Sequence, residues 1–107
     1  MTTDIEMYQG SINVYADLGY PDAEEMLIKA QLVAQIHSAI KTRGWTQQEA
    51  AKVLGLTQPK LSNMLRGQFR GISEAKLMAC LSRLGHRVQI VVSKNIQPVC
   101  PVELVFT

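Results

Sequence analysis

The feature that most constrains this chain is the stretch from Gly44 to Gly67, where two short helical patterns are separated by a very short connection. The first pattern begins at Thr46, because a threonine hydroxyl before a helix can accept an unpaired amide of the first turn. Glu49 lies three residues later and can reach back to the amide of Thr46, which completes a capping box. Gly55 ends the pattern, since glycine enters the left-handed region without steric cost. The sequence therefore predicts a short capped helix between Thr46 and Gly55.

A second capped helix follows almost at once. Thr57 is its predicted cap, and Pro59 lies in the first turn, where a missing amide proton matters least. Gly67 ends this helix. Because so short a connection makes the two helices cross at a steep angle, the pair is predicted to form a helix-turn-helix. Apolar residues recur on one face of the second helix and are predicted to be buried: Leu61, Met64 and Leu65.

Helical patterns also flank this pair, so the predicted fold is mainly α-helical. A long helix is expected to begin at Asp22, which we predict to be its cap, and to end near residue 41 or 42. Another is expected over residues 74–84, behind a cap at Ser73. With a short helical hook before them, this makes four to five helices. We expect the chain to divide into an N-terminal arm (1–20), a helix-turn-helix domain (21–85) and a C-terminal segment (86–107).

The spacing of apolar residues changes in the C-terminal segment. Over residues 87–93 they alternate, with Val88, Ile90 and Val92 on one face, which predicts a β-strand used in dimerisation. Residues 102–106 alternate again and are predicted to be a second strand. A lone strand leaves its backbone groups unpaired, so it can pair with the same strand of a second copy around a two-fold axis. A hairpin of 87–93 with 102–106 is the competing arrangement, and the two can coexist.

The segment TQQEAAKVLGLTQPKLSNMLRG, residues 46–67, resembles the helix-turn-helix of the XRE family, the Cro and phage-repressor type. The segments NVYADLG, residues 13–19, and LGHRVQIVV, residues 84–92, extend the match to one branch that contains HigA-type antitoxins. The resemblance covers roughly residues 13 to 93. It implies a lambda-repressor-like domain, a homodimer, and a RelE/HigB-like ribonuclease toxin as partner.

The second helix of such a motif enters the major groove with its N-terminal end first. Gln58 matches the family position that reads a base edge, and Gln47 matches a family position that binds backbone phosphate. A glutamine or asparagine can hold adenine through two hydrogen bonds, and we expect Asn63 to share this chemistry with Gln58. The expected base contacts are Gln58, Pro59, Ser62 and Asn63. The expected phosphate contacts are Gln47, Thr57, Lys60, Arg66 and Arg70.

Charge is distributed unevenly along the chain. Residues 1–28 carry six acidic and no basic residues, whereas the remainder carries all 11 basic residues and three acidic ones. This asymmetry favours a basic body that meets phosphates and an acidic arm that avoids them. Cys80, Cys100 and the two histidines lack metal-ligand spacing, so we expect no metal and no cofactor.

Several other classes of protein do not fit the sequence. No apolar run approaches the roughly 20 residues of a membrane span, and no basic-then-apolar leader opens the chain. We therefore expect a cytoplasmic protein that has no membrane partner. Paired carboxylates, a nucleophile–base arrangement and a phosphate loop are also missing from the sequence, so we do not expect an enzyme.

These features together predict a homodimeric repressor on a palindromic double-stranded DNA operator, with half-sites about one helical turn apart. By resemblance it is also expected to be the antitoxin of a type II toxin–antitoxin pair that autoregulates its operon. The alternative is a stand-alone phage-type repressor without a toxin.

Overall fold

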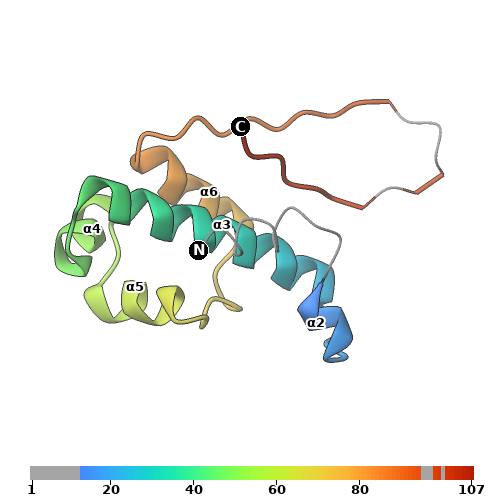
Figure 1. Cartoon of the computed structure of the whole chain (residues 1–107), viewed down its shortest axis with the longest axis horizontal. Coiled ribbons are helices and arrows are strands. Elements are labelled where there is room, and N and C mark those ends of the chain that lie inside the picture. Colours follow the sequence, from blue (N-terminus) through green and yellow to red (C-terminus); the bar gives the residue numbers. More distant parts are fainter. Residues whose placement is uncertain (1–12, 95–97, 100) are drawn as a thin grey trace.

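The structure is a computed structural model that describes residues 13–94, 98–99 and 101–107. Five α-helices make up the body of this described part (Figure 1). They are α2 (Val14–Asp17), α3 (Ala23–Arg43), α4 (Gln47–Leu54), α5 (Gln58–Leu65) and α6 (Glu74–Arg83). The prediction of a mainly α-helical chain with a helix-turn-helix is therefore confirmed.

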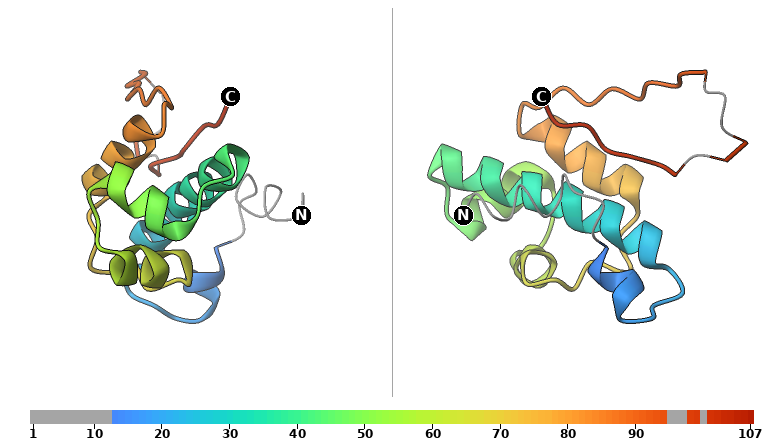
Figure 2. Two further views of the ribbon diagram at one scale, coloured as in Figure 1. Left: turned by 90° about the vertical axis from the view of Figure 1, so that its left-hand side faces the viewer. Right: turned by 45° about the vertical axis from the view of Figure 1, so that its right-hand side comes forward.

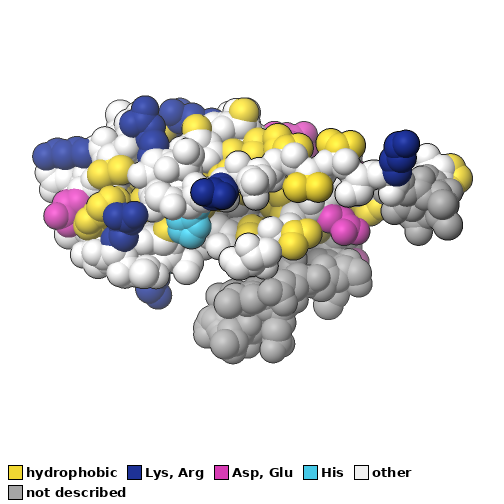
Figure 3. All heavy atoms as spheres, turned by 90° about the horizontal axis from the view of Figure 1, so that it is seen from above, with side chains coloured by type: hydrophobic (Ala, Val, Ile, Leu, Met, Phe, Trp, Pro, Cys, Tyr) yellow, Lys and Arg dark blue, Asp and Glu magenta, His cyan; other side chains and the backbone are white. Residues whose placement is uncertain are grey.

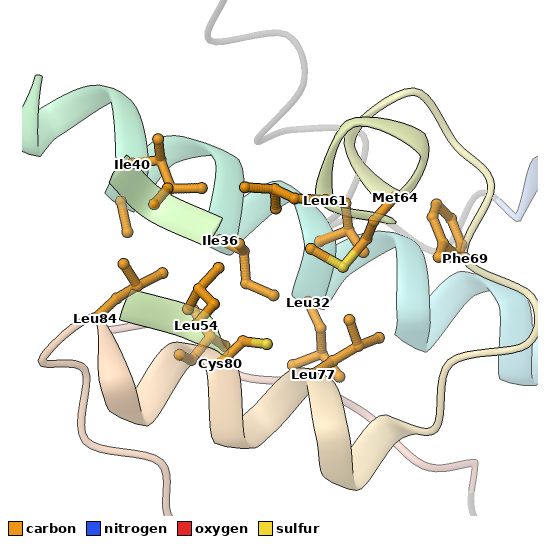
Figure 4. Packing of buried hydrophobic residues seen from close by; sticks show 14 of the residues in the cluster. Leu32, Ile36, Ile40, Leu54, Leu61, Met64, Phe69, Leu77, Cys80 and Leu84 are labelled. Atoms are coloured by element: carbon orange, nitrogen blue, oxygen red, sulfur yellow. The ribbon is translucent and has the colours of Figure 1, made fainter. Parts of the chain in front are cut away.

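The long helix α3 is the centre of the fold. In Figures 1 and 2, α6 lies along one side of α3 and α5 lies on the other, with α4 near the end of α3 and α2 near its beginning. Figure 4 shows side chains from α3, α4, α5 and α6 pointing into one shared interior. Burial of this apolar surface is the main force that holds the helices together. The fully buried large side chains are Ile36, Leu54, Leu61, Met64, Leu77, Leu84 and Cys80.

The start of α3 differs from the prediction. Asp22 occupies the position before the helix, but its side chain caps no amide there. Instead its carboxylate forms an ion pair with Arg70, in the loop after α5. The local sequence pattern predicted that Asp22 caps α3, but the folded chain brings Arg70 to its carboxylate instead.

The C-terminal β-strand predicted over 87–93 is not formed, and neither is the second strand over 102–106. Both described runs are extended and belong to a loop that reaches beyond the helices (Figure 1). Ile90 is 78% exposed and its neighbour Val91 is 80% exposed, so neither face of the run is buried. An alternating pattern becomes a strand only when a second edge accepts its hydrogen bonds, and the described part of this chain supplies no such edge.

None of the described helices is both long enough and apolar enough to span a membrane.

Candidate nucleic-acid interface

The helix-turn-helix is built from α4 and α5, and its end caps are those predicted. The Thr46 hydroxyl accepts from the amide of Glu49 at 3.1 Å, and the Glu49 carboxylate accepts from the amide of Thr46 at 2.8 Å. The hydrogen bond from the Thr46 backbone amide, and next to it one from the Thr46 side chain, lower the pKa of the Glu49 carboxyl, because they favour its ionised form. At the start of α5 the Thr57 hydroxyl accepts from the amide of Lys60 at 3.2 Å. Both helix starts are therefore determined locally.

The turn between the two helices depends on Gly55. This residue ends α4 with a φ of +69°, a left-handed conformation that a side chain disfavours. Its amide donates to the carbonyl of Lys52, and the next amide, that of Leu56, donates to Ala51 at 2.9 Å. The chain therefore leaves α4 in a fixed direction and enters α5 after only three residues, Gly55, Leu56 and Thr57.

The orientation of α5 follows from its apolar side. Leu61 and Met64 are 0% exposed, packed against the core, so the opposite side of the helix must face outward. Gln58, Pro59 and Lys60 are exposed on its first turn, and Ser62 and Asn63 are half-buried. The predicted base contacts therefore all lie on α5, and those of its first turn are the most open.

The residues predicted to contact phosphate lie around this exposed side of α5, but some of their side chains already bind other groups of the protein. Gln47 is exposed at the first residue of α4, and Arg66 is exposed at the end of α5. Thr57 is exposed, but its hydroxyl already serves as the cap of α5. Arg70 lies further along, with its guanidinium bound to Asp22.

The electrostatics of the motif favour an anionic partner. Residues 50–73 contain four basic residues and no acidic residue. The amides at the N-terminus of a helix add a partial positive charge of their own. The exposed start of α5 therefore offers hydrogen-bond donors in positive surroundings.

Sequence reasoning missed the contacts that hold the loop after α5. Lys29 on α3 is only 3% exposed, and its ammonium donates to the carbonyl of Arg70 at 2.7 Å and pairs with Glu25 at 2.8 Å. The Arg70 guanidinium also lies 5.3 Å from the centre of the Tyr20 ring. The Glu25–Lys29 spacing of four residues was a readable signal for the helical pair, but nothing local pointed to Arg70.

Two further arginines donate hydrogen bonds to backbone carbonyls near the C-terminal ends of helices. Arg43 donates to the carbonyl of Leu84 at 2.8 Å and lies 5.0 Å from the Trp45 ring centre. Arg83 donates to the carbonyl of Val53 at 3.2 Å, near the end of α4. A cation at a helix C-terminus meets the negative end of the dipole, so these side chains join α3, α4 and α6.

The two histidines and Cys80 fit no metal site. Within the described ranges, no three potential metal-binding side chains of His, Cys, Asp or Glu come together. Burial raises the pKa of the Cys80 thiol, which keeps it in its unreactive protonated form. Cys100 lies outside the described residues.

Comparison with known proteins agrees with this geometry. A family profile described as a helix-turn-helix domain matches residues 14–93. A solved structure named as a candidate XRE-family transcriptional regulator aligns with a TM-score of 0.71 at 31% identity, over 81% of this chain and 98% of the other. The chain belongs to the XRE helix-turn-helix family. The curated proteins contain no match.

Membership of the XRE family makes the chain a DNA-binding helix-turn-helix regulator rather than an enzyme. The family profile spans residues 14–93, which include all five described helices, so the relation extends beyond the motif to the helical domain. The predicted resemblance to the XRE family is thereby confirmed.

Proposed function

We propose that this XRE-family chain is a sequence-specific repressor that reads DNA with the exposed side of α5. The observation that carries the proposal is the position of Gln58, which is exposed at the helix start with no acidic residue from 50 to 73. A glutamine amide can bind adenine through two hydrogen bonds in the major groove. Lys60, on the same turn, supplies sequence-independent attraction to phosphates.

The test begins with selection of binding sites from a randomised double-stranded DNA library, followed by quantitative shift assays on the selected site. Gln58→Ala should weaken that site by about 1–3 kcal/mol and relax one base position in each half-site. His37→Ala, at an exposed polar residue on α3 outside both the motif and the C-terminal segment, is the control. Lys60→Ala should weaken all sequences alike and reduce the salt dependence. Unchanged binding by Gln58→Ala would remove this residue from the interface.

We also propose a homodimer formed through the C-terminal segment, with Val88, Ile90 and Val92 at the interface. Ile90 and Val92 are 78% and 91% exposed, and hydrophobic side chains lie open along this side of the molecule in Figure 3. Contiguous exposed apolar surface of this kind marks interaction sites, and pairing with a second copy would satisfy the unpaired backbone. A two-fold axis would also match a palindromic operator.

Sedimentation equilibrium tests the dimer. Ile90→Glu should convert the dimer to a monomer and abolish binding to paired half-sites, because it buries a charge in the interface. Ser93→Glu, which lies next to Val92 but outside the apolar set, should leave the mass unchanged. A monomeric wild-type protein, or a dimer that tolerates Ile90→Glu, would refute the arrangement.

The antitoxin function rests on the resemblance to HigA-type antitoxins over residues 13–19 and 84–92, and on charge. Asp17 and Glu24 are exposed near the start of the described chain and form no ion pair with a described residue. An acidic surface suits a basic ribonuclease toxin. Co-purification with the product of the adjacent open reading frame tests this function, and a gene whose neighbours encode no binding protein leaves a stand-alone repressor.

A further inference from the structure

The end of α5 contains a hydrogen bond that changes what the helix can read. The guanidinium of Arg66, through Nη2, donates to the side-chain oxygen Oδ1 of Asn63. Arginine has no acceptor atom, so the amide atom that faces it must be the oxygen. The amide nitrogen of Asn63 therefore points away from Arg66.

The backbone holds this pair in place. The carbonyl of Asn63 accepts from the amide of Arg66 at 3.1 Å and from the amide of Gln68 at 2.9 Å. The next amide, that of Gly67, donates to the carbonyl of Met64, whose side chain is fully buried. The two polar side chains are thus attached to a section of chain that the core keeps fixed. No carboxylate within residues 50–73 competes for the guanidinium.

The pair differs chemically from a free asparagine. A free asparagine offers one acceptor and donors, which suits the N6 donor and N7 acceptor of adenine. Arg66 takes one of the two lone pairs of Oδ1 and adds the N–H groups of its own guanidinium, so Asn63 and Arg66 together offer mainly N–H donors. Guanine presents two acceptors in the major groove, O6 and N7, and no donor there. The pair therefore complements the two acceptors of guanine better than it complements adenine, whose N6 donor must share Oδ1 with Arg66.

We propose that Asn63 and Arg66 act as one donor unit that selects guanine in each half-site, with Arg66 positioning the Asn63 amide. This inference rests on the proposed DNA reading by α5. Under this proposal the two ends of α5 recognise different bases. The exposed side-chain amide of Gln58 has no hydrogen-bond partner among the described residues and can bind adenine, whereas the Asn63–Arg66 pair requires acceptors.

Library selection with variants separates this unit from the general function. The probe is double-stranded DNA with a randomised core, and the position read by Asn63 is the one whose preference Asn63→Ala removes. Wild-type protein should select guanine there. Arg66→Met frees Oδ1, so adenine should gain on guanine by about ten- to a hundredfold, the range of one bidentate contact. Arg66→Lys keeps a donor beside Oδ1 and should retain guanine.

Arg87→Met is the matched control, because it removes an exposed arginine outside the motif. It should lower affinity without changing any base preference. Circular dichroism checks that each variant folds, since a purely structural role of Arg66 would change the melting temperature and no base preference. Adenine at the Asn63 position in wild type, or an unchanged preference in Arg66→Met, would overturn the donor unit. A wild-type protein that selects no motif at all would instead refute the proposed function.

Discussion

The contact between Gly85 and Arg43 gives a stability prediction that can be worked out from the structure. Gly85 follows α6 with a φ of +88°, and a Cβ at this position would lie 2.8 Å from Arg43 Nη2. That nitrogen donates to the carbonyl of Leu84. Gly55 also has a left-handed φ, +69°, but a Cβ there would meet no heavy atom within 4 Å. The two glycines therefore differ in what an added methyl group displaces.

A left-handed backbone costs an alanine about 1–2 kcal/mol, so Gly55→Ala should lower the free energy of unfolding by that amount. Gly85→Ala pays the same backbone cost and also displaces Arg43, whose partly exposed bond to the Leu84 carbonyl contributes about 1 kcal/mol. The expected loss for Gly85→Ala is then about 2–3 kcal/mol. The extra part corresponds to about 4–8 °C in the melting temperature of a domain of this size.

Urea denaturation of both variants measures this difference, with each substitution also made in an Arg43→Ala background. Removal of Arg43 leaves nothing for the methyl group to displace, so the extra loss at Gly85 should disappear there. Equal losses at Gly55 and Gly85 in the wild-type background would refute the reasoning. If Gly85→Ala still lowers the free energy of unfolding more than Gly55→Ala in the Arg43→Ala background, the backbone at Gly85 alone accounts for the difference.

Two further predictions concern the helix cap and the loop after α5. Since the hydrogen bonds of Thr46 lower the pKa of Glu49 in the folded state, their contribution to stability is complete above the usual glutamate pKa of about 4.3. It is lost as the pH falls through the lowered folded value. Glu49→Gln, which removes the titrating carboxyl, should therefore reduce the fall in melting temperature between neutral and acidic pH, and an unchanged fall would count against the capping box. Asp22→Asn should release Arg70 from its ion pair and leave the guanidinium free to bind phosphate. DNA binding at low salt should therefore strengthen more than in Glu24→Gln, which makes the same charge change at an exposed carboxylate that has no ion pair with a described residue. Equal effects of the two substitutions in shift assays would show that Arg70 meets no phosphate.

The parts of the fold that the sequence predicted well are those determined by neighbouring residues. Thr46 with Glu49 and Thr57 with Lys60 are each three residues apart, and both caps form as expected. The apolar spacing of Leu61 and Met64 also identified the buried side of α5, and hence the exposed side. The outward position of the candidate reading surface could therefore be worked out before the structure.

The parts that could not be predicted depend on contacts between distant residues. Lys29 meets the Arg70 carbonyl across 41 positions, and Arg70 meets Asp22 across 48. A local pattern made Asp22 a helix cap and Arg70 a free phosphate contact, because it could not show that the fold brings the two charges together. The Asn63–Arg66 hydrogen bond is local, yet helical spacing alone does not say which of several neighbours a side chain will choose.

The sequence by itself determined where the helices of the motif begin and end and which side of α5 is apolar, because caps, glycines and helical periodicity act within a few residues. The tertiary structure decided which charged groups remain free to bind a partner. Lys29 binds the Arg70 carbonyl, and Asp22 pairs with Arg70, only because α3 and the loop after α5 come together. It also decided the state of residues 87–93. Alternation makes such a run able to pair, but a β-strand exists only where a second edge is present to receive its hydrogen bonds.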